Sequence, residues 1–246
     1  MKSRLMCVFL LLAGPAAAQL DQSNLNRIGI TVINADSPRE NYAAGAMVSA
    51  ADLSVPARAR KEFDKANALL RKQDWSHAAK DLAKAVSIDP AFSGAYNNLA
   101  VAYANLGDIA CERDALQKAI ELNDHFALAY VNLGRMDIAT ANYRAAQTSL
   151  EKASSLDSTD ATALSLLAYA ELMQDHFEQA IVASRKAHAL DAPHALAHRF
   201  AARAFEQSGQ FDSALAELTQ SLKEEPSGPR ADSARREIDT VRRLRR

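Results

Sequence analysis

The stretch Ala95–Tyr103, with the sequence AYNNLAVAY, carries the pattern that decides the fold. It places the large side chains Tyr96, Leu99 and Tyr103 at three- and four-residue steps. Such steps bring side chains onto one face of an α-helix. Ala100 lies among them and is small enough to let a second helix approach closely. The stretch therefore predicts a helix that packs against an antiparallel neighbour.

The same pattern returns every 34 residues on both sides of this stretch. Five windows align in one register without an insertion, and they begin at Ala59, Ser93, Ala127, Ala161 and Ala195. The eighth residue of each window is small: Ala66, Ala100, Gly134, Ala168 and Ala202. The seventeenth is bulky and apolar: Trp75, Ile109, Tyr143, Phe177 and Phe211. The twentieth is alanine in four windows and Glu112 in the second. A period of this length indicates stacked helix–turn–helix units.

A turn is expected between the two helices of each window. The residues Asp74, Asp108 and Asn142 stand directly before the bulky seventeenth residue of the first three windows. Their short polar side chains are suited to accept hydrogen bonds from the free N–H groups of a helix start. They are therefore predicted to be the N-caps of the second helices.

These columns resemble the tetratricopeptide-repeat family, whose pattern of Trp-x2-Leu-Gly-x2-Tyr, then Ala-x3-Phe, then Pro they match from Ala59 to about Pro226. The resemblance implies an all-α fold, a right-handed solenoid of five helix–turn–helix repeats, over residues 57–228. The repeats are expected at about 59–92, 93–126, 127–160, 161–194 and 195–228.

A basic capping helix is expected at residues 229–246, after the last repeat. Its apolar residues fall at three- and four-residue steps and form one stripe: Ala231, Ala234, Ile238, Val241 and Leu244. Arginines occupy much of the remaining surface, so a contact with an anionic membrane is the alternative. The stripe is narrow and lacks the aromatic and leucine content of membrane-binding helices, so membrane contact is not expected.

The N-terminus has the three-part layout of a secretory signal peptide at residues 1–18. Lys2 and Arg4 precede the apolar run Leu5–Ala13, and Ala16–Ala18 offers small residues for cleavage before Gln19. The chain is therefore expected to be exported, into the periplasm of a bacterium or out of the cell. Residues 19–56 are predicted to form a leader that is flexible or contains a short strand, at Ile28–Ile33.

Composition and motifs exclude several classes of function. The 29 Lys and Arg residues nearly balance the 30 Asp and Glu residues, whereas nucleic-acid binding would need a strongly basic domain. The sequence contains no Gly-rich phosphate loop, no CxxC pair, no HExxH and no G-x-S-x-G. Neither catalysis nor a cofactor is expected. Cys111 would be the single cysteine after removal of the signal, and it is expected to be a buried hydrophobe.

Three histidines come nearest to a metal-binding pattern. His194 and His198 have helical i, i+4 spacing, and His188 lies near the end of the preceding helix. The pattern places no carboxylate beside them, so ordinary surface histidines are expected rather than a metal site. Zinc is accordingly not expected to change the melting temperature.

The family resemblance implies that the first helix of each repeat lines a concave, peptide-binding groove. Carried onto this sequence, the groove is expected to contain Asn98, Val101, Leu128, Val131, Asn132, Arg135, Ile138, Tyr169, Leu172, Met173, Arg199 and Arg203. An apolar floor with arginines beside it suits a peptide that carries hydrophobic anchors and a carboxylate. The alternative is that some of these residues pack between neighbouring repeats.

Two narrower modes of peptide binding known in the family can be compared with these positions. A clamp for a C-terminal carboxylate is excluded, because Phe63, Leu128 and Asn132 occupy the places of its basic residues. A two-rung ladder that would hold the backbone of a peptide, made by Asn98 and Asn132, remains open.

The predicted function is thus an interaction module that binds a peptide or protein segment of unknown identity. The alternative is a structural or chaperone-like subunit of a cell-envelope assembly complex.

Overall fold

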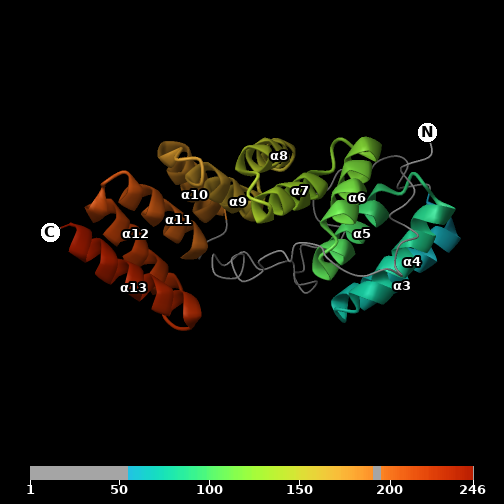
Figure 1. The fold of residues 1–246 in the computed structure, drawn as a ribbon, viewed down its shortest axis with the longest axis horizontal. Helices are drawn as coiled ribbons and strands as arrows, with labels where there is room; N and C mark the ends of the chain where they lie inside the picture. Colours follow the sequence, from blue (N-terminus) through green and yellow to red (C-terminus); the bar gives the residue numbers. More distant parts are fainter. Residues whose placement is uncertain (1–54, 191–194, 246) are drawn as a thin grey trace. The chain divides into compact units, whose positions relative to one another are not determined.

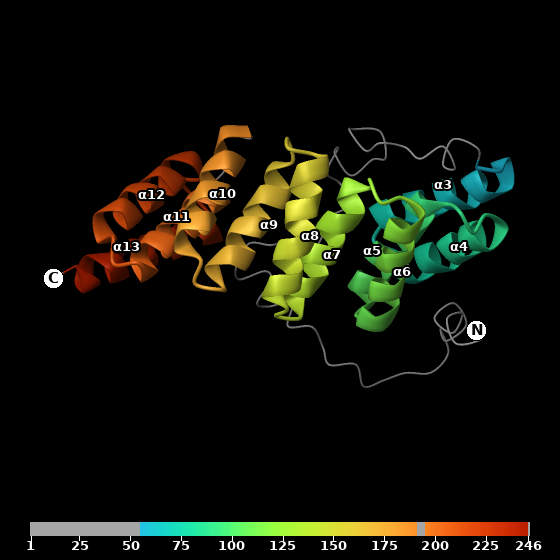
Figure 2. The same ribbon diagram turned by 90° about the horizontal axis from the view of Figure 1, so that it is seen from above.

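The computed structural model describes residues 55–190 and 195–245 (Figures 1 and 2). All regular secondary structure in these two ranges is α-helical, so the predicted all-α class is confirmed. The predicted signal peptide at 1–18, the possible strand Ile28–Ile33 and nearly all of the leader lie outside the described residues. None of the described helices combines the length and the apolar character needed to cross a bilayer.

The helices form two compact units, with the boundary between Ala139 and Thr140. In the first unit, each helix packs on the next one along the chain. Its members are α3 (Ala57–Arg71), α4 (Trp75–Ile88), α5 (Ser93–Leu106), α6 (Ile109–Leu122) and α7 (Ala127–Ala139). The third sequence window is divided by the boundary, since α7 ends the first unit and α8 begins the second.

The second unit has the same consecutive packing, and α9 also contacts α11. Its members are α8 (Tyr143–Leu156), α9 (Ala161–Leu172), α10 (Phe177–Leu190), α11 (Ala195–Gln207), α12 (Phe211–Glu224) and α13 (Pro229–Leu244). A contact between helices two places apart is what a stack of helical hairpins produces, because successive first helices lie next to one another.

Small residues allow the paired helices to approach, as the sequence predicts. Ala66 and Ala100 are at most 1% exposed in the first unit, and Ala168 and Ala202 at most 2% in the second. Large side chains fill the space beside them. In the first unit the rings of Phe63 and Phe92 lie 4.7 Å apart, centroid to centroid, inside a cluster with Leu82, Leu99 and Leu116.

The backbone repeats with the same period as the sequence. One residue in each of the five turns has a positive φ angle: Gln73 (59°), Gly107 (76°), Ala141 (58°), Asp175 (61°) and Gly209 (77°). All five occupy the fifteenth position of their window. This left-handed conformation favours glycine, which supplies it in two of the turns. The shared position supports the window register independently of the side chains.

Two of the three predicted N-caps are present. The carboxylate of Asp74 accepts a hydrogen bond from the backbone N–H of His77 at 3.3 Å, and that of Asp108 from Cys111 at 3.1 Å. The prediction is wrong for Asn142, whose side chain donates to the hydroxyl of Thr140 and does not cap α8.

Helix α13 covers the last helical hairpin of the second unit. Four of the five residues in its predicted stripe are buried: Ala231, Ala234, Ile238 and Val241. Leu244 is 54% exposed and lies at the end of the helix. The apolar face of α13 packs on α12, and the side chain of Arg199 on α11 donates to Glu237 and Ser233 of α13. The stripe is therefore used within the second unit.

Candidate functional site

The twelve predicted groove residues fall in both units. Asn98 and Val101 lie on α5, and the five from Leu128 to Ile138 lie on α7, all in the first unit. Tyr169, Leu172, Met173, Arg199 and Arg203 belong to α9, its C-terminal end and α11, in the second unit.

Burial separates these residues into packing residues and accessible ones. Val131, Asn132, Ile138 and Leu172 are between 2% and 6% exposed, which gives them mainly a packing role. Met173 is 43% exposed, and Arg203 is also exposed. The others are half-buried: Asn98, Val101, Leu128, Arg135, Tyr169 and Arg199.

Four asparagines form a chain of hydrogen bonds across three helices of the first unit. Asn132 Nδ2 on α7 donates to Asn97 Oδ1 on α5 at 2.9 Å. Asn97 Nδ2 donates to Asn98 Oδ1 at 3.2 Å, and Asn98 Nδ2 donates to Asn67 Oδ1 on α3 at 2.7 Å. Hydrogen bonds of this kind offset the cost of burying amide groups. Asn98 and Asn132, the proposed rungs of a ladder, are thus linked to one another through Asn97.

A small cavity of about 20 Å³ lies beside this chain. Its lining includes Val101, Glu112, Asn132 and Arg135. A volume of this size holds a group no larger than one water molecule, so it cannot take a peptide side chain. Burial raises the pKa of Glu112 to about 7, although the positive charges of Arg135 and Arg113 oppose the shift. This part of the first unit is a packed polar interior.

The second unit presents an ordered aromatic group. The ring of Tyr169 on α9 lies edge-on to Tyr143 of α8, with centroids 6.3 Å apart, and 5.5 Å from the ring of Phe200 on α11. Burial and, to a smaller extent, the neighbouring Tyr143 raise the pKa of Tyr169 to about 12. Its phenol therefore keeps its proton at neutral pH. Rings packed in this way lose little conformational freedom when a ligand binds.

A polar cleft of about 290 Å³ lies between α11 and α13 of the second unit. Its lining consists of Arg203, Glu206, Gln207, Ser233, Arg236, Glu237 and Thr240. Arg199 is engaged with Glu237, whereas Arg203 and Arg236 form no ion pair with any described residue. The positive charge of Arg203 also opposes the rise in the pKa of Tyr169, so Arg203 lies within electrostatic range of the aromatic group.

We call Tyr169, Met173, Arg203 and Arg236 the α11 face of the second unit. Met173 follows Tyr169 by four residues at the end of α9, so both point to the same side. The face combines an anchored aromatic ring, an exposed apolar side chain and two guanidinium groups without ion-pair partners among the described residues. The sequence interpretation missed Arg236, because it considered only first helices and left the capping helix out of the groove.

The surroundings of His188 and His198 differ from those that the sequence predicts. The side chains of His188 and His198 are 31% and 11% exposed, and Glu224 lies beside both of them. The expectation of ordinary surface histidines without a nearby carboxylate is wrong for this pair. His194 lies outside the described residues.

Comparisons with known proteins find tetratricopeptide repeats in this chain. Models of the tetratricopeptide repeat match residues 63–125, 127–160 and 171–238. No curated protein sequence matches the chain. Among solved structures, residues 41 to the end of MamA from Desulfovibrio magneticus are 21% identical, over 72% of this chain and 99% of that chain, with a TM-score of 0.65.

Two further structures have the same fold. YrrB, described as a TPR protein with an unusual peptide-binding site, is 19% identical over 72% of this chain and 92% of its own, with a TM-score of 0.62. The pilF protein of Pseudomonas aeruginosa is 17% identical over 75% of this chain and 88% of its own, with a TM-score of 0.64. At these identities the likeness establishes the fold and leaves the ligands open.

Proposed function

The chain belongs to the tetratricopeptide-repeat family, and on that premise we propose that it binds a peptide segment of a partner protein on the α11 face of the second unit. The family supports a role in protein–protein interaction in general. The family is typically not enzymatic, and we propose that this chain also performs no catalysis. The packing of the Tyr169 ring against Tyr143 and Phe200, within range of the positive charge of Arg203, is the observation that carries the peptide-binding proposal.

The chemistry of this face suggests which peptides it accepts. Tyr169 is held by two neighbouring rings, and aromatic side chains of this kind are frequent binding hot spots. The guanidinium groups of Arg203 and Arg236 offer planar donors that match a carboxylate. Met173 adds a flexible apolar contact. We therefore propose a ligand with an acidic group, or a C-terminal carboxylate, next to an apolar or aromatic residue.

Replacement of Tyr169 or Arg203 by alanine is expected to weaken peptide binding by ~1–3 kcal/mol each. The probes are peptides selected from a random phage-displayed library on the purified chain, and affinities are measured by fluorescence polarisation. High salt should reduce the effect of Arg203→Ala, because salt screens an exposed charge pair. It should leave the effect of Tyr169→Ala unchanged.

The matched control is Lys186→Ala, which removes an exposed positive charge from α10 of the same unit. This variant should bind the selected peptides like wild type. If the selected peptides bind Tyr169→Ala and Arg203→Ala with full affinity, the peptide-binding site lies outside the α11 face. Failure to select any peptide, together with capture of the chain in a stoichiometric complex from envelope extract, would favour the structural or chaperone-like subunit.

We also propose that the chain is exported after removal of residues 1–18, on the strength of the N-terminal pattern alone. Mass spectrometry of the protein recovered from the cell envelope should find Gln19 at the N-terminus. Recovery of chains that begin at Met1 and stay in the membrane fraction would contradict this proposal. The proposal does not include attachment of the protein to a membrane through α13, because most of the apolar stripe of that helix is buried in the second unit.

A further inference from the structure

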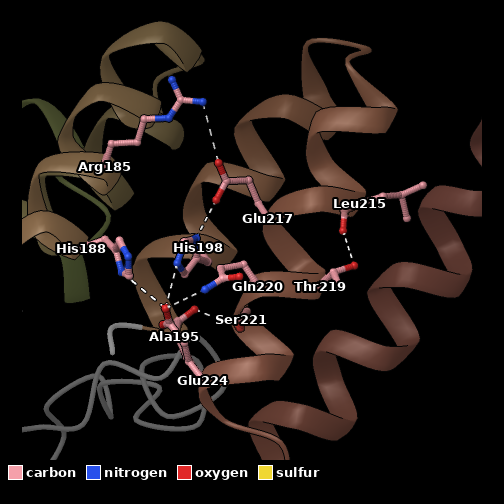
Figure 3. Close-up of polar contacts among 10 residues, drawn as sticks. All are labelled: Arg185, His188, Ala195, His198, Leu215, Glu217, Thr219, Gln220, Ser221 and Glu224. Carbon is pink, nitrogen blue, oxygen red and sulfur yellow. Dashed lines mark hydrogen bonds and ion pairs between the residues drawn. The ribbon is translucent and has the colours of Figure 1, made fainter. Parts of the chain in front are cut away.

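Three successive helices of the second unit bring two imidazoles and one carboxylate together (Figure 3). His188 comes from the last turn of α10, His198 from the first turns of α11, and Glu224 from the end of α12. One ligand atom from each residue can be chosen so that all three lie within 4.8 Å of one another. The rings of His188 and His198 have their centroids 4.4 Å apart.

The spacing of these atoms is close to that of ligands around one metal ion. Glu224 Oε1 lies 3.2 Å from His198 Nε2 and 3.6 Å from His188 Nδ1. Zinc binds nitrogen and carboxylate oxygen at about 2.0–2.2 Å in tetrahedral geometry, which separates neighbouring ligands by about 3.3–3.6 Å. Both distances from Glu224 are therefore compatible with a shared ion after small movements of the side chains.

Glu217 is placed to orient the His198 ring. Its Oε2 atom lies 2.6 Å from His198 Nδ1, on the side of the ring away from Glu224. A carboxylate bonded to one ring nitrogen fixes that proton there and directs the other nitrogen to a metal, as second-shell carboxylates commonly do for histidine ligands. A guanidinium nitrogen of Arg185 lies 3.8 Å from the other oxygen of Glu217.

The environment of His188, the other histidine of the cluster, independently indicates a ligand. His188 Nδ1 is fully enclosed and forms no hydrogen bond with any described residue. Among the described residues, the acidic atom nearest to it is Glu224 Oε1, which is too distant for a hydrogen bond. An enclosed nitrogen without a bond is costly, and an ion at this position would satisfy it.

We propose that His188, His198 and Glu224 form a binding site for Zn²⁺, with Glu217 as a positioning residue. Two imidazoles favour zinc and related transition metals over Mg²⁺ or Ca²⁺, which prefer oxygen ligands. Two histidines and one glutamate leave the fourth tetrahedral position open to a small exogenous ligand. The ion would join α10, α11 and α12, and hence two consecutive repeats, within the second unit.

The test uses the purified chain without a histidine tag, stripped of metal with a chelator and titrated with ZnCl₂ in a calorimeter. We expect one zinc per chain and a rise in melting temperature of ~5–10 °C when free zinc reaches about a hundred times its dissociation constant. His188→Gln and His198→Gln should each abolish this high-affinity event. Glu217→Gln should weaken it by ~10–100-fold, since outer partners tune metal affinity by that factor. MgCl₂ should produce no shift.

The control is His77→Gln, which alters an exposed histidine that also pairs with a carboxylate, that of Asp74 in the first unit. It should bind zinc like wild type. Circular dichroism of each variant without metal checks that it is folded. Absence of zinc binding to the wild-type chain would overturn the proposal, as would full binding by folded His198→Gln. Unchanged affinity in Glu217→Gln would remove the positioning role.

Discussion

Replacement of Leu99 by alanine is expected to lower the free energy of unfolding of the first unit by ~2–5 kcal/mol. Leu99 is 2% exposed, and it packs in the cluster that joins the helices of this unit. Its truncation removes buried apolar surface and leaves a cavity that rigid neighbouring helices cannot fill. Urea unfolding followed by the fluorescence of Trp75 measures the effect, because this single tryptophan lies on α4 of the same unit.

Leu133→Ala is the matched comparison for this prediction. The sequence assigns Leu133 the same window position as Leu99, and from the repeat alone the two truncations should cost the same. The structure leaves Leu133 half-buried at the edge of the cluster. Its truncation should therefore cost less than that of Leu99, since less surface returns to water. Equal losses would show that repeat position, rather than burial, determines the contribution of these leucines.

The repeated framework could be predicted from the sequence because each of its features recurs five times. Small residues such as Ala66 and Ala202 lie where paired helices meet. The turn residues at the fifteenth position, from Gln73 to Gly209, adopt the same left-handed conformation. Local patterns of this kind depend on neighbours three, four or 34 residues away, and a periodic sequence displays those neighbours directly.

Side-chain partners that occur only once could not be predicted in the same way. Asn97 and Asn132, for example, are bonded at a separation of 35 residues, close to one repeat. His188 and Glu224 are 36 residues apart. A search for polar pairs about one period apart would have found both, whereas a search along single helices finds neither. The bond between Arg199 and Glu237 was missed for the same reason, because it joins two different helices. Arg199 was expected at the groove edge and is instead bonded to the capping helix α13.

The second large effect concerns Glu112, the exception in the alanine column at the twentieth window position. Its side chain is buried at the point where α5, α6 and α7 of the first unit line a small cavity. Burial raises its pKa from 4.5 to about 7, while Arg135 and Arg113 act in the opposite direction. A carboxylate in this position is harder to ionise in the folded chain than in the unfolded one.

This difference makes the stability of the first unit depend on pH. Between the unfolded pKa of 4.5 and the folded pKa of about 7, the folded state holds more protons than the unfolded state. The stabilisation is therefore complete below pH 4.5 and is lost as the pH rises through about 7. A shift of this size corresponds to about 3 kcal/mol between the two limits.

Glu112→Gln is expected to remove that loss, because glutamine keeps the shape of the protonated acid and does not ionise. Wild type and variant should have similar stability near pH 4.5, and the variant should be more stable by up to ~3 kcal/mol near pH 8. Urea unfolding monitored by Trp75 fluorescence at both pH values measures the difference. Glu121→Gln, an exposed change on the same helix, is the control and should follow the wild-type profile within ~0.5 kcal/mol. Parallel profiles for Glu112→Gln and wild type would mean that Arg135 and Arg113 fully compensate the burial of this carboxylate.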